Sequence, residues 1–257
     1  MLEDAAPPTP SVCSCLFVTA SSRCLRWPFA GPESPPGQRE CHAVESLDES
    51  IAQTLQLLAH MPSNALRQWQ TAQASELDRM AEAHKTIGGS APGRRWRLQH
   101  LNDAYIVLLA AHFQSFCRNL HSEAASAVAA ATQPPGVQIA VLSAMQADRR
   151  LDRGNATVEN IRGDFAKFGM TFWIAVESYD TRNRTRRLRL DQLLTWRNAI
   201  AHQDFRFSAE TQKKLAGTDR TLTSIKRWRS TCNELAANFD AAVHDYVRGL
   251  TGIAPWV

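Results

Sequence analysis

Residues 95–131 read RWRLQHLNDAYIVLLAAHFQSFCRNLHSEAASAVAAA. Apolar and aromatic side chains recur along this stretch at intervals of three or four residues, and they place one continuous stripe on a helix. The side chains that define the stripe are Leu98, Leu101, Tyr105, Leu108, His112 and Phe116. The spacing predicts one long helix at the centre of the domain core.

The same helical period continues on both sides of this segment and predicts an all-α fold without a secure strand or an internal repeat. Residues 172–176, at the start of the predicted helix 172–179, have a composition that fits a buried strand equally well. The other predicted helices end at prolines, glycines or polar turns. In chain order, the predicted segments are 51–61, 66–85, 137–151, 158–168, 172–179, 190–202 and 222–246, with a further helix start at Ser208 and a stop at Gly217.

Composition sets broad limits on what the chain can be. The 257 residues are 44% hydrophobic and 21% charged, which is typical of a globular protein with one substantial domain. The net charge of +4 permits a polyanionic partner such as RNA. The apolar runs are too short to span a membrane, and Glu3 and Asp4 stand where a secretory signal needs basic residues. We therefore expect a cytoplasmic protein.

Residues 1–45 differ from the rest of the chain. They hold seven of the twelve prolines and four of the six cysteines, without a helical or alternating period. We predict a poorly ordered tail over 1–45 and a helical domain over 46–257. The tail's four cysteines and His42 suggest zinc, but their irregular spacing lacks a Cys-X2-Cys pair, so we expect no metal and no cofactor.

The candidate chemistry lies in the segment Arg197-Asn198-Ala199-Ile200-Ala201-His202. A helix turns about 100° per residue, so Asn198 and His202 lie about 40° apart on one face, whereas Arg197 and His202 lie about 140° apart. Two copies of this helix meeting about a twofold axis would gather two sets of these side chains in one polar cleft. The geometry therefore favours a homodimer in which both chains contribute to the site.

These residue types suit RNA cleavage by the adjacent 2'-hydroxyl, which needs proton transfer and stabilisation of charge on phosphate oxygens but no metal. His202 can transfer protons near neutral pH, and Arg197 can bind phosphate oxygens through two parallel hydrogen bonds. Asn198 can orient the histidine or a ribose hydroxyl. We expect catalysis from Arg197, Asn198 and His202.

The segment resembles the Arg-X4-His motif of the HEPN superfamily, and residues 193–202 resemble especially its RiboL-PSP-HEPN branch. The resemblance extends more weakly over about 95–257. The resemblance implies a dimeric helical bundle. For function, it implies a metal-independent endoribonuclease of a toxin or defence system, with a possible antitoxin partner. The alternative that it implies is a catalytically silent module that binds RNA, a nucleotide or a protein. Gln203 departs from the glycine common after the motif histidine and puts the helix end in question.

Other readings remain open. Arg197 could pair with Asp191 or Asp204, while His202 caps the helix, and the chain could be a helical scaffold unrelated to HEPN. An arginine-rich run is either an RNA-binding patch or a solvated surface. It consists of Arg182, Arg184, Arg186, Arg187 and Arg189. His112 and His121 fit core or surface roles better than a second site, and Cys117 and Cys232 fit buried apolar positions.

Overall fold

A computed structural model describes residues 61–87 and 95–256. In these ranges the chain is all-α, with no strand. The helices are α2 (Asn64–Gln68), η1 (Trp69–Gln73), α3 (Ala74–Ile87), α4 (Arg95–Ala131), η2 (Pro135–Val137), α5 (Gln138–Gln146), α6 (Arg150–Arg153), α7 (Val158–Phe165), η3 (Ala166–Phe168), α8 (Phe172–Tyr179), α9 (Asn183–His202), α10 (Ala209–Leu215) and α11 (Leu222–Thr251).

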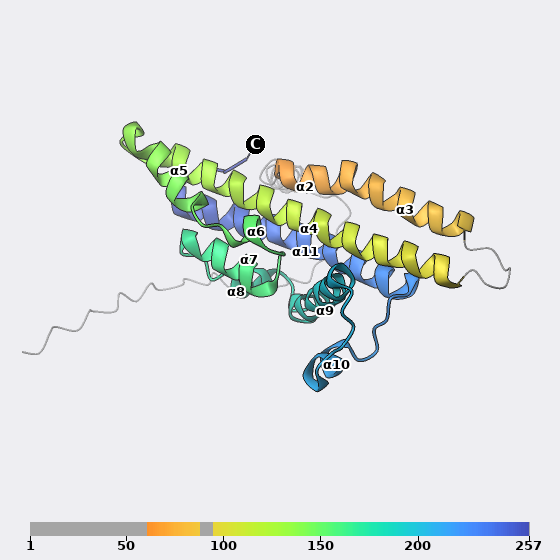
Figure 1. Ribbon diagram of the computed structural model, residues 1–257. Coiled ribbons are helices and arrows are strands. Elements are labelled where there is room, and N and C mark those ends of the chain that lie inside the picture. Colours follow the sequence, from red (N-terminus) through yellow and green to blue (C-terminus); the bar gives the residue numbers. More distant parts are fainter. Residues whose placement is uncertain (1–60, 88–94, 257) are drawn as a thin grey trace, which may run out of the picture. The chain divides into compact units, whose positions relative to one another are not determined.

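Helix α4 is the centre of the bundle, as its sequence predicts. It packs against α11 along its length, with α2 and α3 on one side and α9 on the other (Figure 1). Its most deeply buried apolar residues include Ile106, Leu109 and Phe113, whereas Leu101 and Leu108 of the predicted stripe are only half-buried. Because neighbours cover α4 from several directions, its buried surface is wider than one stripe.

Aromatic side chains join the helices in the core. Phe239 of α11 packs on Phe113 of α4 and on Phe172 and Trp173 of α8, with ring centroids 4.7–5.9 Å apart. Edge-to-face and offset contacts at these distances add to the stabilisation from buried apolar area. Segment 172–179 is therefore a helix docked through its aromatic residues, which decides between the two readings of its composition.

The predicted helix from 137 to 151 is too long. Helix α5 ends at Gln146, Asp148 has a φ of 52°, and α6 begins at Arg150. The carboxylate of Asp164, which is buried in α7, accepts hydrogen bonds from the backbone N–H groups of Arg150 and Leu151 at 2.9 and 2.8 Å. This carboxylate satisfies N–H groups that a new helix start leaves unpaired, so a residue farther along the chain stabilises the break.

Helix α9 begins at Asn183, seven residues before the first apolar residue of the predicted stripe, so most of the arginine-rich run is helical. Ser208 caps α10 by accepting from the Thr211 N–H at 3.2 Å, and Gly217 has a φ of 72°, as the start and stop signals predict. No helix in the described ranges is long and apolar enough to cross a membrane. The predicted tail over 1–45, its cysteines and all but the last residue of segment 51–61 lie outside the described residues.

Candidate active site

Arg197, Asn198 and His202 lie in the second half of α9. The helix is held in the bundle by Leu190, Leu193, Leu194 and Ile200, which are buried against its neighbours. Arg197 comes four residues after Leu193 and three before Ile200, so it occupies the spacing of the buried stripe. Its side chain is nevertheless only half-buried.

Arg197 has no acidic partner among the described residues. Its Nη1 donates to Oδ1 of Asn198 at 3.2 Å. The two carboxylates that could have neutralised it are otherwise engaged: Asp191 pairs with Lys214 at 2.6 Å, and Asp204 pairs with Arg206 at 2.9 Å. The hydrogen bonds from Arg206 hold the pKa of Asp204 below its usual value. Arg197 thus keeps an uncompensated positive charge at a partly enclosed position.

Asn198 is fixed by a residue that the sequence analysis missed. Asn155, in the loop between α6 and α7, donates through Nδ2 to Oδ1 of Asn198. Nδ2 of Asn160 binds the backbone carbonyl of Asn155 at 2.8 Å, and Nε2 of Gln114 binds that of Gly154 at 2.6 Å. With its oxygen occupied, Asn198 presents its amide hydrogens as donors.

His202 is exposed at the end of α9 and makes no hydrogen bond or ion pair with another described residue. The helix then ends as it would with a glycine. Gln203 has a φ of 52°, its N–H binds the Ile200 carbonyl at 3.2 Å, and the Asp204 N–H binds that of Ala199 at 3.0 Å. This is the Schellman pattern, and Nε2 of Gln203 adds a 2.7 Å bond to the Ile200 carbonyl.

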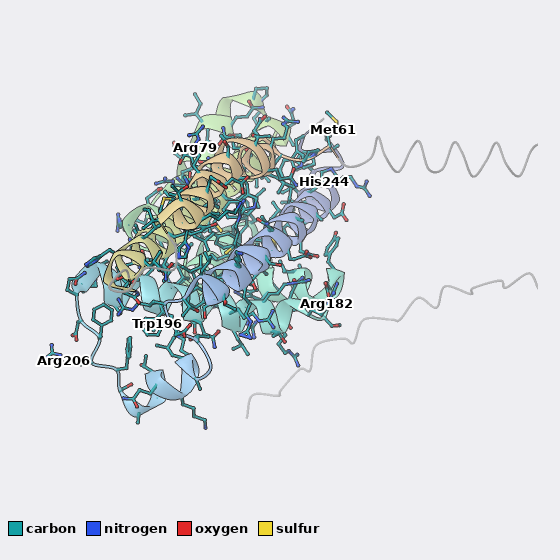
Figure 2. The ribbon with its side chains drawn as sticks, turned by 90° about the vertical axis from the view of Figure 1, so that its right-hand side faces the viewer. Met61, Arg79, Arg182, Trp196, Arg206 and His244 are labelled. Carbon is teal, nitrogen blue, oxygen red and sulfur yellow. The ribbon has the colours of Figure 1, made fainter. Side chains whose placement is uncertain are left out.

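The chain after His202 is anchored by aromatic and basic contacts. Trp196 packs edge-on against Phe207, and the guanidinium of Arg220 lies 4.4 Å from the ring centre of Phe205. Arg220 is itself held by Asp103 of α4 at 2.8 Å. Figure 2 shows Arg206 pointing away from the helices in the region of Trp196. These contacts tie the segment after His202 to the bundle.

The arginine-rich run does not form a single patch. Arg186 is buried and binds Asp180 at 2.7 Å and Glu234 at 3.1 Å. Arg182 also pairs with Asp180, at 2.8 Å, and these two arginines hold the pKa of that carboxyl far below its usual value. The run therefore contains at least one arginine whose role is structural.

Arg184 and Arg187 lie on another side of α9, whereas Arg189 lines the same groove as Arg182 and Arg186. Arg184 and Arg187 face Glu177 of α8 at 3.6 and 3.0 Å, and Arg187 also lies over the ring of Trp173. Arg189 makes no ion pair with a described residue. Of the five arginines expected to bind RNA, Arg189 is the one that the described fold leaves without an acidic partner.

His112 and His121, the two histidines weighed as a second site, have structural contacts. Nε2 of His121 lies 3.2 Å from the Asp164 carbonyl, and burial lowers the pKa of His121 to about 4. His112 faces Glu76 at 3.0 Å. Cys117 and Cys232 are buried free thiols whose pKa values are raised by burial. Within 61–87 and 95–256, no group of three or more His, Cys, Asp or Glu side chains could hold a metal ion.

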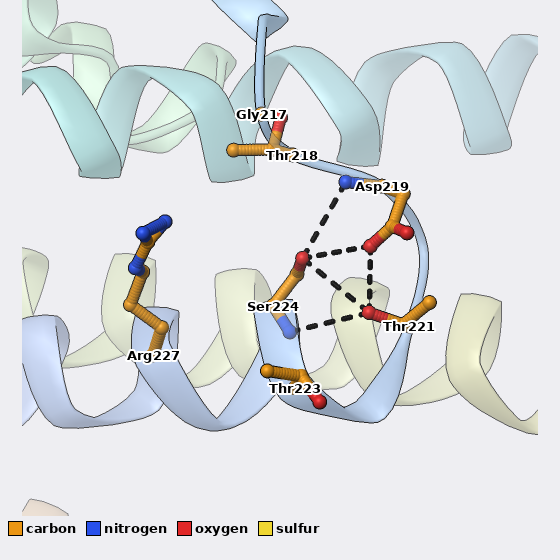
Figure 3. Close-up of a pocket in the computed structure, with 7 residues that line it drawn as sticks. All are labelled: Gly217, Thr218, Asp219, Thr221, Thr223, Ser224 and Arg227. Atoms are coloured by element: carbon orange, nitrogen blue, oxygen red, sulfur yellow. Dashed lines mark hydrogen bonds between the residues drawn. The ribbon is translucent and has the colours of Figure 1, made fainter.

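A hollow of about 640 Å³ lies at the start of α11, and none of the Arg-X4-His residues lines it. Figure 3 shows Arg227 across it from Asp219, whose carboxylate accepts from the hydroxyls of Thr221 and Ser224 at 2.6 and 2.9 Å. These hydrogen bonds also hold the pKa of Asp219 below its usual value. The hydroxyls therefore already serve to cap the helix.

Comparison with known families decides the classification. Residues 76–245 match the family model described as RiboL-PSP-HEPN. The chain belongs to the RiboL-PSP-HEPN family. The HEPN match covers most of α3, α4 to α10 and α11 up to residue 245. It begins earlier than the predicted resemblance over 95–257 and ends before the last residues of α11. No curated protein and no solved structure matches the chain.

Proposed function

We propose that this HEPN protein is a metal-independent endoribonuclease whose composite site uses Arg197, Asn198 and His202 from two copies of the chain. Membership of the family supports an RNA-related function in general terms. The observation that carries the finer proposal is the unneutralised Arg197 beside an Asn198 whose oxygen is fixed and whose amide remains free to donate. This arrangement suits an anionic ligand.

The proposed reaction is attack of a ribose 2'-oxygen on the adjacent phosphorus. The new P–O bond forms as the bond to the 5'-oxygen breaks, leaving a 2',3'-cyclic phosphate and a 5'-hydroxyl. One group removes the proton from the 2'-hydroxyl, and another protonates the leaving oxygen, roles for which exposed imidazoles are suited. Arg197 and the Asn198 amide would stabilise the charge on the non-bridging oxygens.

A dimer would supply both proton-transfer groups. In one chain, Arg197 and His202 diverge by about 140° around α9, so their side chains do not converge on one point from a single helix. His202 of a second copy would bring the acid and the base to opposite sides of one phosphate. We therefore propose a homodimer, with RNA as substrate.

The biological setting proposed is a toxin or defence effector that acts on RNA in the cytoplasm and is restrained by an antitoxin protein. The family resemblance supports this setting. If it is correct, expression of the wild type arrests growth, and expression of His202→Ala at the same level does not. Equal toxicity of the two proteins would contradict it.

The direct test is cleavage of single-stranded and structured RNA by the purified full chain in excess EDTA. We expect products ending in a cyclic phosphate, and we expect Arg197→Ala and His202→Ala to remove the activity. Arg206→Ala is the matched control, because Arg206 is an exposed arginine near the same helix end that pairs with Asp204. Undiminished cleavage in both site variants would overturn the proposal.

The same experiment separates the competing function. A catalytically silent HEPN module that binds RNA, a nucleotide or a partner protein would bind RNA without producing cyclic phosphate ends. Mixing inactive Arg197→Ala with inactive His202→Ala tests the composite site, because a mixed dimer keeps one Arg197 and one His202 in the shared cleft, whereas each variant homodimer lacks one of the two residue types. Partial recovery of cleavage on mixing supports sharing of residues between chains.

A further inference from the structure

A basic groove lies between the first half of α9 and the first half of α11. Its volume is about 410 Å³. The residues that line it are Arg182, Thr185, Arg186, Arg189, Ser230, Thr231 and Glu234. All the titratable side chains on its walls except Glu234 are arginines, and the groove is unlike the hollow at the start of α11, where Asp219 satisfies the hydroxyls.

The charges in this groove are only partly balanced. Glu234 and the neighbouring Asp180 neutralise Arg186, and Asp180 is shared with Arg182. Arg189 has no acidic partner among the described residues. The groove therefore keeps an excess of positive charge, located at its Arg189 end.

Thr231 provides an independent indication of a ligand. The residue is 3% exposed, and its Oγ1 is buried without a hydrogen-bond partner within the described part of the chain. A buried hydroxyl without a partner lowers stability, because the group loses its hydrogen bonds to water and gains none. A valine would fill the same space without this cost. Because Thr231 lines the groove beside the guanidinium groups, we assign its hydroxyl as a donor for an anion bound there.

We infer that the groove binds a phosphate group of the RNA strand, at a position away from the bond that is cut. This inference rests on the proposed function, because it takes the strand to be the substrate. Arg189 precedes Asn198 by nine residues, which is about 900° and places the two on opposite sides of α9. Arg189 precedes Arg197 by about 12 Å along the axis. A strand held at both places crosses the exposed side of α9.

The test measures binding of a ten-nucleotide single-stranded RNA to the His202→Ala protein, which should leave the RNA uncut. Fluorescence anisotropy gives the affinity over a range of salt concentrations. Arg189→Ala in this background should weaken binding roughly 5- to 10-fold and reduce the slope of log K against log salt by about 0.7. The matched control is Arg184→Ala, which removes the same charge from a side of α9 that faces Glu177. Equal losses of RNA affinity in the two variants would show a general effect of charge and would overturn the proposed phosphate site in the groove.

Thr231→Val adds a readout that a structural role would not give. It should raise the melting temperature by about 2–4 °C, since it removes an unpaired buried hydroxyl, while RNA binding weakens about 2- to 3-fold. Unchanged RNA binding in both Thr231→Val and Arg189→Ala overturns the inference. Displacement of the RNA by adenosine monophosphate, dependent on Arg189, would assign the groove to a free nucleotide and overturn the strand as its ligand.

The outcome is independent of catalysis. If the wild-type chain binds RNA through Arg189 but does not cut it, the proposed endoribonuclease function is overturned and the proposed phosphate site in the groove stands. If the wild-type chain cuts the same ten-nucleotide RNA and Arg189→Ala leaves the KM unchanged, the endoribonuclease function stands and the proposed phosphate site in the groove is overturned.

Discussion

The two halves of α9 use arginine in opposite ways. In the first half, Arg186 is buried, and two carboxylates from outside the helix, Asp180 and Glu234, neutralise it. In the second half, Arg197 stands at the same kind of inward-facing position, 11 residues and therefore close to a whole number of turns later, without a carboxylate. Arginine thus forms a buried ion pair in the first half of α9, whereas in the second half its guanidinium has no acidic partner among the described residues.

This difference matters because a partly buried charge without a partner is unfavourable in an isolated fold. A protein gains nothing in stability from Arg197 as it stands, whereas a bound phosphate would supply the missing negative charge. The contrast separates positions kept for stability from positions suited to a ligand, and it makes the two arginines a matched pair for mutation.

The largest expected effect is on activity at Arg197. Arg197→Ala should reduce RNA cleavage by about 100- to 1,000-fold, since it removes a donor aimed at charge that develops in the transition state. Its effect on the free energy of unfolding should stay within about 0.5 kcal/mol, because no ion pair is lost. Arg197→Lys should also lose most of the activity, since lysine lacks the two-pronged geometry. Cleavage rates and urea unfolding on the same preparations provide the measurements.

Arg186→Ala should show the reverse pattern in stability. Removing the guanidinium leaves Glu234 without this cation and Asp180 paired with Arg182 alone, which should cost about 3 kcal/mol, toward the low end for buried pairs because Glu234 is half-exposed. Urea unfolding measures the loss. A variant with wild-type stability would show that the first half of α9 does not depend on this ion pair, and the comparison would fail.

His121 shows a third way to keep a buried basic group, which is to leave it uncharged. Its pKa falls to about 4 through burial, and its Nδ1 has no partner among the described residues. The unfolded chain, with a pKa near 6.5, binds the proton first, so stability is full above pH 6.5 and declines as the pH falls toward 4. Between pH 7 and pH 5 this group should remove about 2 kcal/mol from the free energy of unfolding.

The measurement for His121 is the difference between wild type and His121→Gln in urea unfolding at several pH values. Glutamine cannot titrate and keeps an N–H donor for the Asp164 carbonyl. The difference in free energy of unfolding between the two proteins should change with pH between 6.5 and 4 and stay constant above pH 6.5. A flat difference throughout would mean that His121 is protonated normally in the folded state.

Asn155 links the loop after α6 to the second half of α9, and its effect should be smaller. Asn155→Ala removes one of the two hydrogen bonds that Oδ1 of Asn198 accepts and leaves the one from Arg197. It should lower kcat for RNA cleavage about 10-fold, with KM little changed, because in the proposed site Asn155 positions Asn198 rather than binding substrate. Asn119→Ala is the control, since Asn119 bonds Gln68 far from α9 in sequence. A loss of stability of several kcal/mol in place of a kcat effect would show a purely structural role.

The sequence predicts the parts of this molecule that depend on local periodicity. The bounds of α4, the start of α11 at Leu222 and the helical setting of Arg197 and His202 follow from the spacing of apolar residues, whereas α11 runs to Thr251, beyond its predicted end at 246. What it does not predict depends on contacts between distant segments. Asp164 creates the break between α5 and α6, and Glu234 decides which arginine is structural. Asn155 lies 43 residues before its partner Asn198, and no spacing rule connects the two.

The smallest expected effect is at Gln203, where the second half of α9 ends. A non-glycine residue at a φ of 52° pays a steric penalty, and glycine is the residue most often found there. Gln203→Gly should therefore stabilise the chain by about 0.5–1 kcal/mol, even though it loses the side-chain bond to Ile200. Gln203→Ala is the control, because it loses the same bond but keeps the Cβ, and it should be less stable than wild type. Urea unfolding ranks the three proteins.

Since the backbone pattern around His202 stays the same, RNA cleavage by Gln203→Gly should remain within about twofold of wild type. A glycine variant that is more stable but inactive would mean that His202 depends on the glutamine side chain, and that the helix end belongs to the site rather than to the scaffold.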